Sequence, residues 1–289
     1  MSLTLRSLTR LSTLITALVA SVGGTLLITA QPAAAAVSGL VVVTNTSGPN
    51  SSNKSVSVAC PVGKRVINAG GFVSGGGGKV ILDDILPDPL LGAVTAHGMK
   101  TDLYTVPWSI TAVATCAVAP SGLQFIQAAS DYDDTSVKTA TAQCPVGKKA
   151  LGTGASLEGT NGEVWVDEIW PDGGPGLGTN RVDVLAVAGD PYPSDWRVRS
   201  YAICAYPLLG QQTLTEQTAS DNSNKGITVS CPAGQVATGS GVKLLEGFGE
   251  VVIVHALPYS TAAVAVYGEV NDGSTANWAI RAYVNCVDG

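Results

Sequence analysis

The chain contains the same pair of signatures three times. The first signature is Cys-Pro-x-Gly, which begins at Cys60, Cys144 and Cys231. The second is a tryptophan eight residues before a cysteine, in the pairs Trp108 and Cys116, Trp196 and Cys204, and Trp278 and Cys286. The first cysteines are 84 and 87 residues apart. This self-similarity predicts three copies of one structural unit.

Each copy has the pattern of short β-strands. A middle segment aligns without gaps as Lys79–Pro87, Glu163–Pro171 and Glu250–Pro258, each preceded by glycine and ended by proline. In the closing segment, a period of two places the tryptophan and the cysteine on one face, which we expect to be the core face. No apolar run repeats at helical spacing. About five or six strands per unit are therefore predicted.

The predicted fold is all-β, with three tandem antiparallel sandwich-like repeats related by a pseudo-threefold arrangement. The alternative is a single β-prism in which each unit contributes one sheet. The strand pattern lapses between the copies, which gives repeats at 37–122, 123–210 and 211–289.

Residues 1–36 have the composition of a secretory signal peptide. Arg6 and Arg10 precede an uncharged stretch from Leu11 to Ala30, and QPAAAA offers a cleavage site ending at Ala35 or Ala36. The alternative is a retained membrane anchor, since the uncharged run is about long enough to span a bilayer. We expect cleavage, no membrane insertion afterwards, and a secreted protein that is extracellular or at the cell surface.

The charge balance limits the class of partner. The whole chain carries a formal charge of −6, and loss of the leader with its two arginines makes this −8. A chain this acidic is not expected to bind nucleic acid or anionic lipid.

Six cysteines in an exported chain predict three disulfides. Pairing within units is favoured because it gives every copy the same geometry, and the bonds are Cys60–Cys116, Cys144–Cys204 and Cys231–Cys286. No C-x-x-C occurs, and His97 and His255 lie in different units, so neither a redox centre, a metal site nor a cofactor is expected. Cys-Pro-Val-Gly itself matches a type I turn.

Small residues follow each Cys-Pro-x-Gly at matching positions, and we expect them to form a slot for a large ring. They are Asn68 and Gly70, Gly152 and Gly154, and Gly239 and Gly241. The predicted occupant of each slot is the tryptophan of the same unit.

These motifs also resemble a known module. Cys-Pro-x-Gly-Lys, a glycine pair, a proline-ended strand and a last strand ending Tyr-Ala-Ile-Cys are similar to a repeat found in secreted actinobacterial proteins and at the ends of some bacterial fibre proteins. The resemblance covers the mature chain and implies no particular activity. Unit 3 departs from it at Gln235 and Asn285. A fainter similarity, limited to Cys-Pro-x-Gly and threefold repetition, is to the vitelline outer-layer β-prism proteins.

Catalytic motifs are scarce, so the chain is predicted not to be an enzyme. No G-x-S-x-G elbow occurs, and neither histidine has a nucleophile partner in sequence. Paired carboxylates occur as Asp83-Asp84 and Asp167-Glu168. Glycosidases need two carboxylates at a defined separation, and neighbours on a strand are expected to point to opposite faces. Solvated acids at a strand end are the plainer interpretation.

Two tryptophans are not demanded by the repeat, and both lie in unit 2. Trp165 and Trp170 stand where the other units have Ile81 and Leu86, or Val252 and Leu257. Sugars stack on aromatic rings while acids accept hydrogen bonds from their hydroxyls. The predicted ligand-binding residues are therefore Trp165, Trp170, Asp167, Glu168 and Asp172. The alternative is that Trp170 fills a gap between units.

The loops before the first cysteines are rich in small polar residues. Asp131, Asp133 and Asp134 have oxygen ligands suited to calcium, but turns explain the composition equally well.

The functional prediction is a secreted, non-catalytic binding or cell-surface protein that recognises a glycan or a cell-surface polymer. The alternatives are a structural envelope or matrix protein without a small ligand, and a secreted hydrolase.

Overall fold

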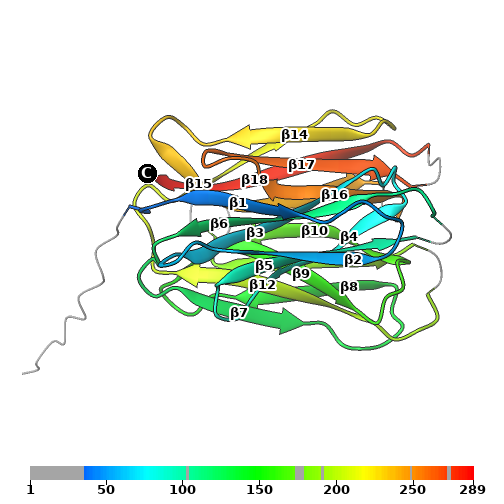
Figure 1. The fold of residues 1–289 in the computed structure, drawn as a ribbon, viewed down its shortest axis with the longest axis horizontal. Helices are drawn as coiled ribbons and strands as arrows, with labels where there is room; N and C mark the ends of the chain where they lie inside the picture. Colours follow the sequence, from blue (N-terminus) through cyan, green and yellow to red (C-terminus); the bar gives the residue numbers. More distant parts are fainter. Residues whose placement is uncertain (1–35, 102–103, 173–178, 190–191, 248, 272–274) are drawn as a thin grey trace, which may run out of the picture. The chain divides into compact units, whose positions relative to one another are not determined.

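The computed structural model describes residues 36–101, 104–172, 179–189, 192–247, 249–271 and 275–289. The predicted signal peptide lies outside these residues, except for Ala36. The described chain forms strands joined by loops, without a helix (Figure 1). None of it is a helix long and apolar enough to cross a membrane.

Each unit contains six strands, as the prediction of five or six allowed. Unit 1 has β1 (Val41–Thr46), β2 (Lys54–Ala59), β3 (Arg65–Ser74), β4 (Val80–Pro87), β5 (Ala93–Lys100) and β6 (Ser109–Ala117). Unit 2 has β7 (Gln124–Ala129), β8 (Val137–Gln143), β9 (Lys149–Glu158), β10 (Val164–Asp172), β11 (Arg181–Ala188) and β12 (Arg197–Ala205). Unit 3 has β13 (Gln212–Gln217), β14 (Lys225–Ser230), β15 (Gln235–Glu246), β16 (Val251–Pro258), β17 (Ala263–Val270) and β18 (Trp278–Asp288).

The strands form three antiparallel six-stranded sheets, and every sheet is shared by two units. The strand orders are β1-β6-β3-β16-β17-β14, β13-β18-β15-β10-β11-β8 and β2-β5-β4-β9-β12-β7. Each unit therefore gives three strands to each of two sheets, and the units are joined in a closed cycle at β3–β16, β10–β15 and β4–β9. The all-β prediction of three sandwich-like repeats is confirmed. The alternative with one sheet per unit is wrong, because no sheet belongs to a single unit.

Within a unit, the closing strand places its tryptophan and cysteine in the core. Trp108, Trp196 and Trp278 are at most 1% exposed, which confirms the predicted core face. All three predicted disulfides form within units, with Cα–Cα distances of 5.6 to 5.7 Å.

A lysine ammonium covers each core tryptophan. The Nζ atoms of Lys54, Lys138 and Lys225 lie 4.2, 5.1 and 4.7 Å from the centroids of the Trp108, Trp196 and Trp278 rings. Each ammonium group also donates to a carbonyl oxygen of the loop that precedes its own strand, at Asn50 before β2, Asp131 before β8 and Asp221 before β14. The lysine therefore combines a cation–π contact with closure of the loop, and it recurs in all three units.

The small residues after Cys-Pro-x-Gly do not receive the tryptophans, so that prediction is wrong. Instead, they let strands of neighbouring units approach. A Cβ atom on Gly70, Gly154 or Gly241 would lie 2.6 to 2.7 Å from a backbone oxygen or proline Cδ atom of the adjacent unit. The tryptophan rings of units 1 and 3 lie instead against Gly98 and Gly268. The error arose because the glycines face another unit, which a single repeat does not reveal.

The Cys-Pro-x-Gly turn also differs from the expected type I turn. Lys64 N donates to Pro61 O at 3.0 Å, so the turn begins at the proline, and its third residue Gly63 has φ +82°. A positive φ at this position is the mark of a type II turn, and it explains the glycine. The side chain of the residue after this glycine forms a hydrogen bond with a residue at or just before the start of the first strand of the same unit. Lys64 Nζ donates to Gly39 O, Lys148 Nζ to Gln124 Oε1, and Gln235 Nε2 to Gly210 O.

Candidate functional site

The middle strands β4, β10 and β16 each contain a β-bulge at the same position. The register shifts place Asp83, Asp167 and Val254 in the three bulges. The next residue of each strand pairs with the neighbouring hairpin strand, in the pairs Asp84 and His97, Glu168 and Leu185, and His255 and Tyr267. The same backbone thus presents three different sets of side chains, each beside a junction between units.

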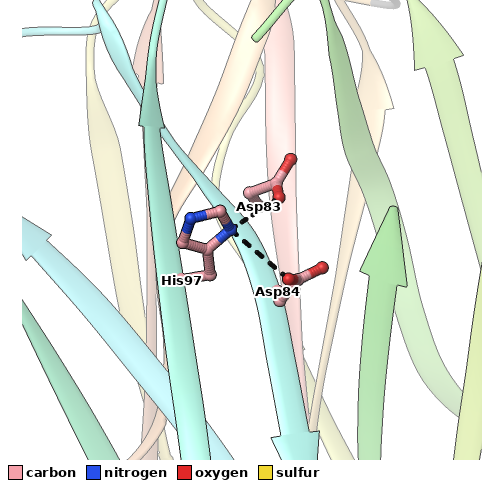
Figure 2. Close-up of side chains that lie close together, drawn as sticks. All are labelled: Asp83, Asp84 and His97. Atoms are coloured by element: carbon pink, nitrogen blue, oxygen red, sulfur yellow. Dashed lines mark hydrogen bonds and ion pairs between the residues drawn. The ribbon is translucent and has the colours of Figure 1, made fainter. Parts of the chain in front are cut away.

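In unit 1 the bulge brings two carboxylates to one imidazole. His97 Nδ1 lies 3.1 Å from Asp83 Oδ2 and 3.4 Å from Asp84 Oδ2. Figure 2 shows both carboxylates, from neighbouring positions of one strand, beside the ring from the next strand. The expectation that Asp83 and Asp84 point to opposite faces is therefore wrong, because the bulge breaks the alternation of the strand.

The pKa values of His97 and of Asp83 are both raised above their usual ranges, for different physical reasons. Hydrogen bonds to Asp83 and then to Asp84 raise the pKa of His97. Burial raises the pKa of Asp83, while its hydrogen bond to His97 acts in the other direction. Asp83, Asp84 and His97 offer three ligand atoms within 4.8 Å of one another, so they could hold a metal ion. This group was not predicted, because the acids and the histidine lie on different strands and meet only through the bulge in β4.

The equivalent residues of unit 3 form an aromatic contact instead. The His255 ring lies 5.3 Å from the rings of both Phe72 and Tyr267, measured between centroids. Its Nε2 atom is 3.2 Å from Val73 O, and burial lowers the pKa of the imidazole. This histidine joins units 3 and 1 and has no carboxylate at hydrogen-bond distance among the described residues.

In unit 2, the predicted ligand-binding residues divide between the interior and the surface. Asp167 is 2% exposed, and burial raises its pKa to about 7. Its Oδ1 atom has no hydrogen-bond partner in the described part of the chain. Trp165 is 6% exposed and its ring lies against Gly189. The two additional tryptophans are therefore not exposed together.

Trp170 and Asp172 are partly exposed on the outward face of β10, and Glu168, on the same face of the strand, is 7% exposed. Lys243 of unit 3 binds Glu168 at 2.9 Å, and its Nζ atom is 4.5 Å from the centroid of the half-buried Trp170 ring. Asp172 pairs with Arg181. Trp170 thus contacts the adjoining unit, as the gap-filling alternative expected, and it also keeps part of its surface accessible.

Strand register extends this outward face across β11 to β8. One row across β10, β11 and β8 consists of Trp170, Asp183 and Thr141. A second row consists of Asp172, Arg181 and Gln143. Thr141 donates to Asp183 at 2.6 Å, and Arg181 donates to Asp183 at 2.8 Å. We call these six residues the unit 2 strip. Thr141, Gln143, Arg181 and Asp183 were not predicted, although polar residues alternate with alanine at 139–143, which is a sequence signal for Thr141 and Gln143.

The acidic loop of unit 2 has a structural role that the other units share. Asp133 accepts hydrogen bonds from the Thr135 backbone N–H group and from Lys138. The Lys138 hydrogen bond is the main reason that the pKa of Asp133 falls to about 2. Asn50 and Asp221 cap the equivalent loops in the same way. Turn formation therefore accounts for these residues, which supports the turn interpretation over a calcium loop.

No protein-family model matches the chain, and no curated protein is significantly similar to it. The resemblance to secreted repeat modules thus stays a prediction.

Proposed function

We propose that this protein is a secreted, non-catalytic binding protein that recognises a polysaccharide through the unit 2 strip. The observation that carries the proposal is that unit 2 has different residues from units 1 and 3 at equivalent positions of the strip. Where unit 2 has Trp170, Asp183 and Thr141, unit 1 has Leu86, Thr95 and Ser57, and unit 3 has Leu257, Ala265 and Thr228. The fold therefore forms without the tryptophan ring and the carboxylate, whereas a hydroxyl group at the Thr141 position occurs in all three units.

The chemistry of the strip suits a sugar chain. The accessible part of the Trp170 ring offers an apolar surface on which a pyranose can stack. Asp172 accepts hydrogen bonds, Arg181 donates them, and Gln143 does both, so sugar hydroxyls have partners of both kinds. Asp183 is buried and orients Thr141 and Arg181 through its two carboxylate oxygens. The exposed face of an antiparallel sheet is extended, which favours a polymer over a small enclosed ligand.

Two further observations support the class of protein. Three disulfides are typical of an extracellular protein. Among the described residues, neither histidine hydrogen-bonds a serine, threonine or cysteine nucleophile, since His97 contacts carboxylates and His255 a backbone carbonyl. A non-catalytic binding role agrees with this arrangement better than a nucleophilic hydrolase does.

A pull-down on insoluble cellulose, chitin and peptidoglycan tests the proposal. We expect the wild type to bind at least one of these polymers and Trp170→Leu to reduce its affinity by about tenfold, a loss of roughly 1.4 kcal/mol. Leucine already occupies the equivalent position in units 1 and 3, so the fold is expected to tolerate the change. Leu86→Ala is the control at the same position of unit 1. Absence of binding to all three polymers, or equal binding by Trp170→Leu, would contradict the proposal.

A further inference from the structure

A second site lies at the junction between units 1 and 2, away from the unit 2 strip. We propose that Asp83, Asp84 and His97 bind one divalent transition-metal ion of the zinc class. Imidazole nitrogen is a common ligand of zinc, and carboxylate oxygens complete many zinc sites that keep a position open for water. The three residues supply one nitrogen and two carboxylate groups.

The spacing between the imidazole nitrogen and each carboxylate oxygen fits one small ion. Zinc–nitrogen and zinc–oxygen bonds are about 2.0 to 2.2 Å long, so two ligands on adjacent positions of one ion are roughly 2.9 to 3.5 Å apart. The distances from His97 Nδ1 to Asp83 Oδ2 and to Asp84 Oδ2 are 3.1 and 3.4 Å. Both carboxylate oxygens thus already lie at ligand-to-ligand distance from the imidazole nitrogen.

Unit 2 orients both carboxylates. Asp84 Oδ1 accepts a hydrogen bond from the Leu157 backbone N–H group at 3.0 Å, and Asp83 Oδ1 lies 3.4 Å from Thr160 Oγ1. Each acid therefore contacts unit 2 with one oxygen and His97 with the other. Such outer hydrogen bonds fix ligand geometry in metal sites and reduce the cost of assembling the ligands.

The cluster is buried on one side and accessible on the other. The side chains of Asp83, Asp84 and His97 are 3, 13 and 31% exposed. An ion can enter past the imidazole, and water can complete its coordination there.

The scaffold does not require these three residues. Unit 2 has Asp167, Glu168 and Leu185 at the equivalent positions, and unit 3 has Val254, His255 and Tyr267. Both units form the same bulged strand without a His–carboxylate cluster. The competing explanation, an ion pair that only fastens units 1 and 2 together, predicts that added metal leaves the cluster unchanged.

Zinc titration of the metal-free protein separates these explanations. The chain has two histidines, so nitrogen NMR of the imidazoles reports each one separately in the wild type. We expect Zn²⁺ to shift the His97 resonances at one equivalent and to leave those of His255 unchanged. Unchanged His97 resonances would overturn the proposal without any variant having to fold.

Calorimetry on matched variants provides the second test. His97→Gln and Asp84→Asn are expected to weaken Zn²⁺ binding at least tenfold, since even outer-shell changes cost about that much. Asparagine keeps an oxygen that can accept from Leu157. His255→Gln is the control and is expected to bind Zn²⁺ as the wild type does. Equal affinity in His97→Gln, or displacement of Zn²⁺ by an equal concentration of Ca²⁺, would contradict the assignment.

Discussion

Asp167 shows how one bulge position changes character between the copies. Its counterpart Asp83 has a histidine and a threonine as partners, and its counterpart Val254 needs none. Asp167 is buried to the same degree but keeps one carboxylate oxygen without a partner among the described residues. A buried acid in this position favours its neutral form, which explains the direction of its pKa shift.

This shift gives stability a predictable dependence on pH. The pKa of Asp167 is about 7 in the folded protein, against 3.8 for the free group. Between these values the unfolded chain has lost the proton and the folded protein keeps it, so the contribution of Asp167 to stability falls as pH rises from about 4 to about 7. Below this window both states are protonated, and above it the cost stays constant.

We therefore expect Asp167→Asn to increase the free energy of unfolding at pH 8 relative to the wild type and to change it little at pH 4. The difference should grow by at most roughly 1.4 kcal/mol per pH unit within the window. Guanidinium unfolding of both proteins at several pH values measures it. A difference that is independent of pH would contradict this account of Asp167.

At the scale of the strands, the junctions between units are formed by close packing at small residues more than by long runs of backbone pairing. The β4–β9 junction pairs Ile85 with Ala155, and the β10–β15 junction pairs two residues on each strand. Gly154 allows this approach, because a Cβ atom there would lie 2.6 Å from Ile85 O. Backbone oxygen cannot move aside as a flexible side chain can, so a methyl group forces the strands apart.

Gly154→Ala is therefore expected to destabilise the protein by about 1 to 3 kcal/mol. Gly48→Ala is the matched control, since nothing lies within 4 Å of its added Cβ atom, and its effect should stay within about 0.5 kcal/mol. Chemical denaturation of both variants measures the two changes. Equal effects would show that close approach at Gly154 does not determine stability.

The strands also show how much of the fold could be predicted from the sequence. Repetition and the period of two predicted the five or six strands of each unit, the core tryptophans and the disulfides, because these features repeat within every copy. The role of Gly70, Gly154 and Gly241 was missed, because these glycines contact another copy and the repeat does not say which copies touch. The Asp83–Asp84–His97 cluster was missed for a related reason: it depends on a bulge, which changes the register by one residue without any sequence signal as clear as glycine or proline.

The candidate binding face was predicted in part. Trp170 and Asp172 are partly exposed on the outward face of β10, whereas Trp165, Asp167 and Glu168 are buried. Counting the tryptophans beyond the repeat pointed to β10, the strand that contains Trp170. Separating the exposed from the buried positions required the register across β8, β10 and β11.

For the whole molecule, both candidate sites depend on the closed cycle of units. The cluster at Asp83 is oriented by hydrogen bonds from unit 2, and the strip at Trp170 is bordered by Lys243 from unit 3. The first strand of each unit pairs with its last strand at the same point, in the pairs Val41 and Cys116, Gln124 and Cys204, and Gln212 and Cys286. The three units are therefore expected to be interchangeable in chain order.

A circular permutant tests this cycle most directly. Seven residues separate Cys116 from Gln124, and seven separate Cys204 from Gln212. Fusing Gly289 directly to Val37 gives the same spacing between Cys286 and Val41, and new ends between Ala119 and Pro120 open the connector between units 1 and 2. Such permutations are tolerated where the joined ends lie close together.

We expect the permutant to form the same three disulfides and to unfold in one transition, with a free energy of unfolding within about 1 kcal/mol of that of residues 37–289 in their natural order. Guanidinium denaturation followed by tryptophan fluorescence, with disulfide mapping of the folded sample, measures both properties. A permutant with scrambled disulfides, or one that unfolds in separate steps for separate units, would contradict the closed cycle.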